Sequence, residues 1–165
     1  MEQQTLSTPV IFAKQLLVHW QGHRALTRRV IEAFPEEQLF GYSVGGMRPF
    51  ASMAMELIRL ASLGITGMHT GKWDVYDSPL LVKDTPPATK EEILQLWDAL
   101  TTKINTIWPQ IRPERFLEVD KAYGMYEGVV SDLMLYWVDN ENHHRGQGYV
   151  YLRSLGIEPP PFWDR

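Results

Sequence analysis

The chain has 165 residues, of which 44% are hydrophobic and 22% charged, and this is the size and composition of one ordinary globular domain. It carries 16 Lys and Arg against 20 Asp and Glu, a formal net charge of -4, which argues against a nucleic-acid binder that holds phosphates on a basic surface. Cys is absent, so disulfides, thiolate metal sites and a cysteine nucleophile are excluded.

No apolar stretch approaches the ~20 residues of a membrane span. Residues 1–8 are polar and lack the basic start and the apolar core of a signal peptide. These features predict a cytoplasmic protein with neither a membrane nor a nucleic-acid partner. The sequence also shows no internal repeat and no low-complexity linker, so we expect a single domain over residues 1–165.

The first predicted helix covers residues 9–34, where apolar residues recur at spacings of three and four. Pro9 suits its first turn, and Pro35 ends it because the residue before a proline is pushed out of the helical region. The second predicted helix, residues 49–68, is nearly continuous in Met, Ala, Leu and Ile. Such a composition indicates a largely buried helix.

A segment rich in Gly, Asp and Pro, residues 71–87, follows the second helix. It is longer than most connections in a compact domain, and we interpret it as a functional loop that covers a pocket. Thr89 and Glu92 then form a capping-box pattern. The third predicted helix starts there and runs through Ile107, before Trp108 and a proline end it.

The fourth predicted helix covers residues 126–155 and stops at Gly156. No run of alternating strand residues competes with these segments. Helices of about 20 to 30 residues, joined by connections long enough to cross over, are typical of a helical bundle. The sequence therefore predicts an all-α fold, a four-helix bundle.

Polar residues at three positions of the predicted core are candidates for chemistry. Glu56 lies within the apolar body of the second helix, where a carboxylate must be paired, protonated or bound to a cation. Asn140 and His144 are four residues apart on the fourth helix, so their side chains project from adjacent turns and can share a ligand. The structural alternatives are a local salt bridge from Glu56 to Arg59, and a hydrogen-bonded polar layer around Asn140 and His144.

If Glu56 faces His144 across the bundle, the pair supplies an oxygen and a nitrogen ligand, a mixture that zinc, nickel, iron and manganese all tolerate. The remaining histidines carry weaker signals. His19 and His23 are four apart on the first helix, and we interpret them as surface or pocket-rim residues rather than metal ligands. His143 is about 100° around the helix from His144, which favours an outer position.

The sequence from Asn142 to Gly156, Asn-His-His-Arg-Gly-Gln followed by Gly-Tyr-Val-Tyr-Leu-Arg-Ser-Leu-Gly, resembles the fourth helix of the DinB/YfiT-like family. This is a family of metal-dependent helical-bundle proteins, unrelated in fold to the DNA polymerase that shares the DinB name. Residues 18–39 and 47–50 are also similar to the family, so the resemblance spans nearly the whole chain. It implies a four-helix bundle of up-down-down-up topology and a homodimer.

Family members characteristically hold a divalent metal with three histidines, one from the second helix and two spaced by four on the fourth. By position, these ligands fall on Glu56, Asn140 and His144, so one histidine of the three is kept. The resemblance therefore implies a metal site of Glu56, Asn140 and His144 for zinc, nickel, manganese or iron. It makes Glu56 and His144 the catalytic candidates, with Glu56 as general base if it is not a ligand.

Two functional hypotheses follow from the resemblance. The first is a metal-dependent enzyme that acts on a small molecule, either a transferase that uses a low-molecular-weight thiol such as bacillithiol, mycothiol or glutathione, or a hydrolase. The second is a degenerate, metal-free member that acts as a small-molecule-binding or stress-response protein. A purely structural bundle is disfavoured, because a polar layer in the core costs stability with no return.

Overall fold

The structure, a computed structural model, describes residues 10–74 and 87–165. In these residues the elements are α1 (Ala13–Ala33), α2 (Glu36–Gly41), α3 (Phe50–Thr70), α4 (Lys90–Ile107), the 3-10 turns η1 (Trp108–Gln110) and η2 (Pro113–Leu117), the strands β1 (Val119–Ala122) and β2 (Tyr126–Val129), and α5 (Val130–Ser154). In the same ranges, no helix combines the length and the hydropathy that a membrane span requires.

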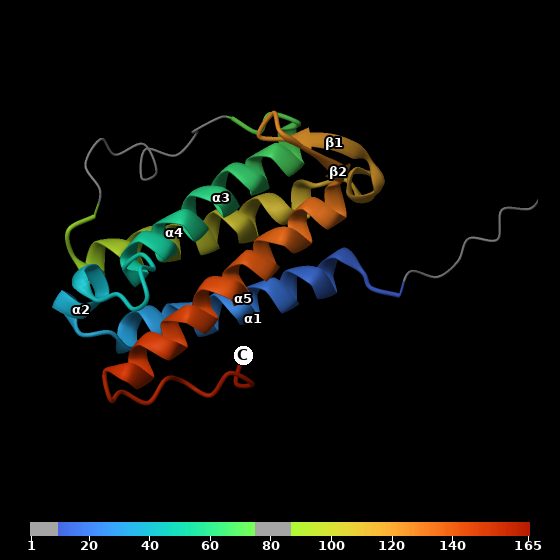
Figure 1. The fold of residues 1–165 in the computed structure, drawn as a ribbon. Coiled ribbons are helices and arrows are strands. Elements are labelled where there is room, and N and C mark those ends of the chain that lie inside the picture. Colours follow the sequence, from blue (N-terminus) through green and yellow to red (C-terminus); the bar gives the residue numbers. More distant parts are fainter. Residues whose placement is uncertain (1–9, 75–86) are drawn as a thin grey trace, which may run out of the picture.

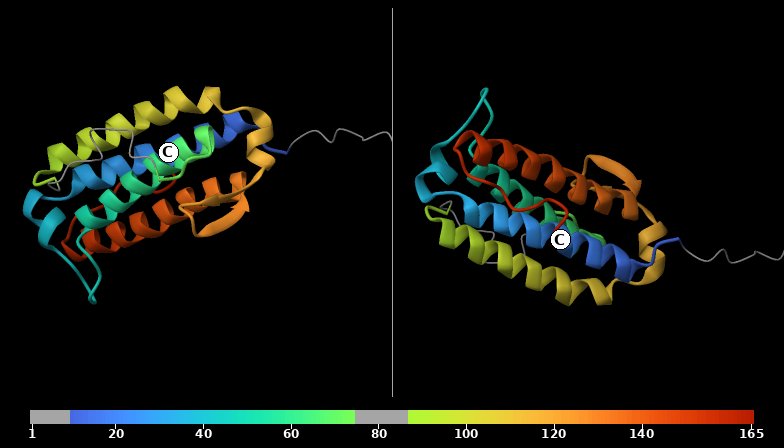
Figure 2. Two further views of the ribbon diagram at one scale, coloured as in Figure 1. Left: turned by 90° about the horizontal axis from the view of Figure 1, so that it is seen from above. Right: turned by 90° about the horizontal axis from the view of Figure 1, so that it is seen from below.

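The long helices α1, α3, α4 and α5 form a bundle (Figure 1). Helix α3 runs opposite to α1, α4 runs in the same direction as α3, and α5 returns in the direction of α1 (Figures 1 and 2). Around the bundle, α1 and α3 are each flanked by α4 and α5. The all-α, up-down-down-up prediction is thus confirmed, and α5 packs against α1 on one flank and α3 on the other.

The predicted helix ends are partly confirmed. The capping box is present, since Thr89 Oγ1 accepts from the Glu92 amide at 3.2 Å and Glu92 Oε2 accepts from the Thr89 amide at 3.3 Å. Helix α1 ends before Phe34, whose backbone is extended ahead of the proline. It begins at Ala13 rather than at residue 9, and the role predicted for Pro9 lies outside the described residues.

The prediction for residues 126–155 is wrong at its start. Residues 126–129 form strand β2, which pairs antiparallel with β1 in the register Val119↔Val129 and Ala122↔Tyr126. The turn between them has φ values of 54° at Tyr123 and 69° at Gly124, the left-handed region that tight hairpin turns use. Strands of four residues are too short for an alternating pattern to register in the sequence.

The predicted lid over residues 71–87 cannot be followed, because residues 75–86 lie outside the described residues.

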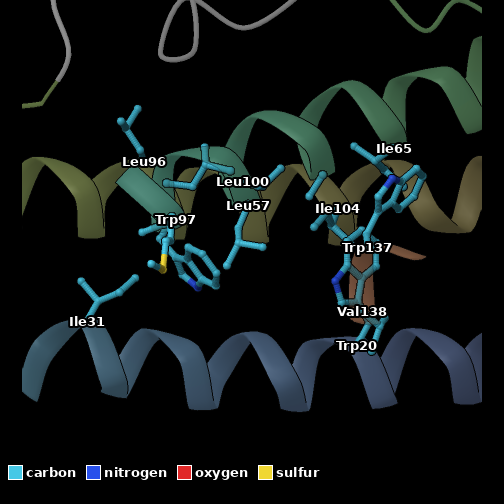
Figure 3. Close-up of a cluster of buried hydrophobic side chains, with 14 of the residues drawn as sticks. Trp20, Ile31, Leu57, Ile65, Leu96, Trp97, Leu100, Ile104, Trp137 and Val138 are labelled. Carbon is cyan, nitrogen blue, oxygen red and sulfur yellow. The ribbon is translucent and has the colours of Figure 1, made fainter. Parts of the chain in front are cut away.

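The core of the bundle is rich in indole rings. Trp20 of α1 and Trp137 of α5 meet with ring centroids 5.7 Å apart, and Trp97 of α4 lies further along the core (Figure 3). Gly64 of α3 allows the Trp137 ring to pack close to the α3 backbone, since a Cβ at position 64 would lie 2.1 Å from Trp137 Cζ2. This close approach fixes the height of α5 against α3, and hence which of their polar residues meet.

Candidate functional site

The structure brings Glu56, Asn140 and His144 together. Glu56 lies in the second turn of α3, and Asn140 and His144 project from successive turns of α5 on the flank that packs against α3. Glu56 Oε1 is 3.1 Å from His144 Nε2 and accepts from Asn140 Nδ2 at 3.4 Å. The three side chains thus form one polar layer between the neighbouring helices α3 and α5.

Arg48, in the segment before α3, is the ionic partner of Glu56. Its Nη2 donates to Glu56 Oε2 at 2.6 Å, whereas sequence reasoning expected a local bridge from Glu56 to Arg59. That expectation is wrong, because Arg48 reaches the carboxylate instead, and its backbone is held against α5 by Tyr151 Oη, which donates to the Arg48 carbonyl at 2.9 Å. Both carboxylate oxygens of Glu56 are therefore engaged, one by Arg48 and one by α5.

The Glu56 carboxylate is held in its ionised form. Burial acts to raise the pKa of Glu56, but hydrogen bonds from Arg48, His144 and Asn140 outweigh it and lower the pKa below the usual value of 4.5. The side chain keeps 30% of its surface exposed. An ionised, partly exposed carboxylate can serve as a cation ligand, whereas a lowered pKa makes it a weak general base.

His144 contacts an oxygen atom at each ring nitrogen. Its Nδ1 is 3.0 Å from Gln147 Oε1, and its Nε2 faces Glu56 Oε1. Gln147 Nε2 in turn contacts the exposed His143 at 3.3 Å, so His143 lies outside this layer, as predicted from its angle on the helix. A neutral imidazole has one N–H and can satisfy only one of two acceptors. Which of the two oxygens accepts a hydrogen bond from His144 therefore depends on the ring tautomer.

A pocket of about 590 Å³ opens beside this layer. Its lining includes Glu56 and Arg48, with Phe40, Met55 and Arg59 around them. Asn140 and His144 do not line it; they reach Glu56 from the α5 side, and the His144 side chain is only 8% exposed. A ligand in this pocket thus meets Glu56 and Arg48 first. Its volume is within the range of small-molecule sites.

A second polar cluster, which sequence reasoning missed, lies on the α1 flank of α5. Glu141 Oε1 accepts from Thr27 Oγ1 at 2.6 Å, and Arg145 donates to Thr27 Oγ1 at 3.0 Å. Arg145 also lies 3.7 Å from Glu141 Oε1 and 2.9 Å from His23 Nδ1. The available signal was an acid and a base four apart, each one residue beyond a predicted ligand.

The interpretation of His23 as a surface or rim residue is wrong, whereas His19 is exposed as expected. His23 is 5% exposed, and its Nε2 lies 3.2 Å from His19 and 2.7 Å from Arg165 of the C-terminal segment. Burial, followed by the charges of Arg145, His19 and Arg165, lowers the pKa of His23 to about 4. His23 is therefore a neutral member of the second cluster at pH 7.

Among residues 10–74 and 87–165, no group of three or more His, Cys, Asp and Glu is close enough to hold a metal ion. In the Glu56 layer, the third polar side chain is the amide of Asn140. A metal there would thus have one carboxylate, one imidazole and one amide from the protein.

Comparisons with known proteins agree on one family. A family model described as "DinB family" matches residues 1–164. A DinB-like protein from Bacillus subtilis is similar in structure, with a TM-score of 0.71 at 20% identity over 92% of this chain and 98% of that one. A DinB-like protein from Bacillus cereus gives a TM-score of 0.72 at 15% identity over 90% and 95%. No curated protein matches. At these identities, the two similar structures support the fold alone.

Proposed function

Since the chain belongs to the DinB family, we propose that it is a metal-dependent enzyme that acts on a small molecule, with Glu56, Asn140 and His144 holding a divalent cation. The observation that carries this proposal is the 3.1 Å separation of His144 Nε2 and Glu56 Oε1, with Gln147 Oε1 beside the other ring nitrogen. In the tautomer in which His144 Nδ1–H donates to Gln147 Oε1, the Nε2 lone pair is directed at the carboxylate oxygen 3.1 Å away. A cation between Nε2 and Glu56 Oε1 removes this repulsion.

The donor atoms fit a divalent ion in type and in spacing. Two ligand atoms that lie about 2.1 Å from one metal ion are about 3.0 to 3.4 Å apart at ordinary coordination angles. The separation of Glu56 Oε1 and His144 Nε2 is within that range. An imidazole whose other nitrogen donates to an amide oxygen, as His144 does toward Gln147, is the usual support for a metal ligand. Asn140 contributes its amide oxygen once the amide turns over, and zinc, nickel, manganese or iron accept this mixture.

The reaction class follows from what such an ion supplies. A bound divalent cation polarises a carbonyl oxygen or lowers the pKa of a thiol or water. This chemistry suits a transferase that uses a low-molecular-weight thiol, or a hydrolase. Arg48 lies on the pocket wall with its side chain half exposed, so it can bind an anionic group of the substrate while its contact with Glu56 orients the carboxylate.

A metal-free binding or stress-response protein is the second candidate, and a specific observation favours it. Arg48 and Asn140 already donate to Glu56, and His144 donates as well in its Nε2–H tautomer. The polar layer is then complete without a metal, and the pocket serves only to bind a small molecule. The two candidates differ in whether Glu56 Oε1 accepts a hydrogen bond from His144 Nε2 or shares a metal ion with it. A homodimer stays a prediction under either.

The test is the metal content of the protein, purified without a histidine tag and measured by elemental analysis. We expect near-stoichiometric divalent metal, lost from Glu56→Ala and from His144→Ala, with helical content unchanged by circular dichroism. His69→Ala is the matched control, because His69 is exposed at the end of α3, and it should keep the metal. Unchanged metal in His144→Ala, or no uptake after incubation with zinc, nickel and manganese, would leave the metal-free candidate.

A further inference from the structure

A second cavity, which we name the hairpin pocket, lies between the β1–β2 hairpin and the first two turns of α5. Its volume is about 340 Å³, and its lining includes Tyr123, Tyr126, Tyr136, Trp137, Glu127 and Asp132. It is separate from the pocket beside Glu56. Asp132 and His144 are twelve residues apart on α5, which is about 18 Å along the helix axis.

Two of the aromatic residues of the hairpin pocket, Trp137 and Tyr123, have their polar atoms hydrogen-bonded within the protein. Trp137 Nε1 donates to Tyr123 Oη at 3.0 Å, and Tyr123 Oη donates to the Leu60 carbonyl at 3.0 Å. Trp137 is 3% exposed and belongs to the core, whereas Tyr126 and Tyr136 are 60% and 55% exposed. The hairpin pocket thus combines a buried indole and a half-buried phenol, both fixed by hydrogen bonds, with two exposed tyrosine rings.

Two carboxylates complete the lining, and no basic residue is among the residues that line it. In the described ranges, neither Glu127 nor Asp132 takes part in an ion pair or a side-chain hydrogen bond, although Lys121 stands opposite Glu127 in the hairpin register. The position of Asp132 in the first turn of α5 favours the helix dipole. The dipole does not account for Glu127 on the strand, nor for the rings between the two acids.

We propose that the hairpin pocket binds a small organic ammonium ion, such as a methylated amine. Aromatic faces attract a cation through the ring quadrupole, and unpaired carboxylates add Coulomb attraction. A volume near the lower end for small-molecule sites suits a compact head group. An inorganic divalent cation is a poorer fit, because it needs several converging oxygen ligands, and the two carboxylates come from separate elements, a strand and a helix. The hairpin pocket does not depend on a metal at Glu56, so it stands apart from the proposed enzyme site.

The test uses two ligands of the same shape and different charge. Choline is titrated into the full chain by calorimetry or NMR, and 3,3-dimethylbutan-1-ol, in which carbon replaces the nitrogen, is titrated in parallel. We expect choline to bind at least about tenfold more tightly, because the neutral molecule fills the same space without the cation–π attraction. Equal affinity of the two molecules, or no choline binding at about 10 mM, a level that saturates even a millimolar site, overturns the proposal.

Variants then locate the binding. Tyr136→Leu removes an exposed ring and should weaken choline binding by about twofold to thirtyfold, the range of a single cation–π contact. The double variant Glu127→Gln with Asp132→Asn should weaken choline and leave the neutral alcohol unchanged. Asp139→Asn, an exposed acid further along α5, is the matched control and should bind as the native chain does. If Asp139→Asn weakens choline as much as the double variant does, only the net charge matters and the hairpin pocket is not the site.

Discussion

Helix α5 carries two polar clusters on its two flanks, and they differ in access to solvent. The open cluster, Glu56, Asn140 and His144 with Arg48, faces α3 and borders the larger pocket. The sealed cluster, which faces α1, consists of His23, Thr27, Glu141 and Arg145. Each has a carboxylate, a histidine and an arginine. The members on α5 alternate along two turns: Asn140 and His144 belong to the open cluster, and Glu141 and Arg145 to the sealed cluster. The two clusters therefore differ in the helix that α5 packs against on each flank.

The two carboxylates respond to these surroundings in opposite directions. Burial raises the pKa of Glu141, and the charges of Arg24 and Arg145 and the hydrogen bond from Thr27 compensate only in part. At Glu56 the hydrogen bonds outweigh burial, so its pKa is lowered. The same residue types therefore stabilise the fold where they are buried on all sides, and remain available to a ligand where one side is open to solvent.

The largest effect is expected from breaking the sealed cluster. Arg145→Met leaves the Glu141 carboxylate buried without its nearest ion partner on α5, and we expect a loss of about 3 kcal/mol in the free energy of unfolding. Urea denaturation measures it. Arg59→Ala, an exposed arginine on α3, should change stability by less than about 0.5 kcal/mol. A similarly small effect for Arg145→Met would show that the sealed cluster does not hold α1 to α5.

The pH dependence of stability distinguishes the clusters next. His23 has a pKa of about 4 in the fold against 6.5 unfolded, so its contribution is complete above pH 6.5 and is lost as the pH falls toward 4. One such proton gives at most about 1.4 kcal/mol per pH unit. Glu141, with its raised pKa, acts in the opposite sense from pH 4.5 upward to that raised pKa. His23→Gln should flatten the slope between pH 6.5 and 5, and His69→Ala should preserve it; equal slopes in both variants would contradict the assignment.

Breaking the open cluster should cost less stability. Glu56→Gln removes an ion pair with a half-exposed Arg48, and exposed pairs contribute about 1 kcal/mol or less. Because the pKa of Glu56 is lowered, this contribution is present above the unfolded pKa of 4.5 and is lost as the pH falls below it. The variant should therefore differ from the native chain at pH 7 and converge with it as the pH falls through the lowered pKa of Glu56. A loss as large as that of Arg145→Met would remove the distinction between the clusters.

The smallest effect on stability is expected from adding a stronger metal ligand to the open cluster. Asn140→His places a second imidazole one turn before His144 and beside Glu56, so that three strong ligands converge. We expect tighter zinc or nickel binding than in the native chain, with unfolding changed by about 0.5 kcal/mol or less in metal-free buffer. Competition with a chelator measures the affinity. Unaltered metal affinity would mean that α5 does not bring position 140 within reach of the ion.

Local patterns predicted much of this molecule. Apolar spacing and the Thr89 capping box located α3 and α4 because helices are stabilised by contacts three and four residues apart. The apolar surroundings of Glu56 marked it as a residue in need of a partner. The hairpin escaped detection because its pairing joins residues up to ten apart, and the short strands have no pattern of their own.

The partners of the polar side chains were decided by the tertiary structure. From the sequence, Arg59, three residues on, was the expected partner of Glu56, and His19 and His23 were both interpreted as surface or pocket-rim residues. The position of Arg48 in the segment before α3 made it the partner of Glu56. Contacts of His23 with Arg145 of α5 and with Arg165 of the C-terminal segment buried His23. Sequence by itself determined the bundle and the candidates Glu56, Asn140 and His144, because hydrophobic periodicity is local. Which polar residues are sealed and which stay open depends on contacts between helices far apart in the chain, and only the assembled bundle fixes those.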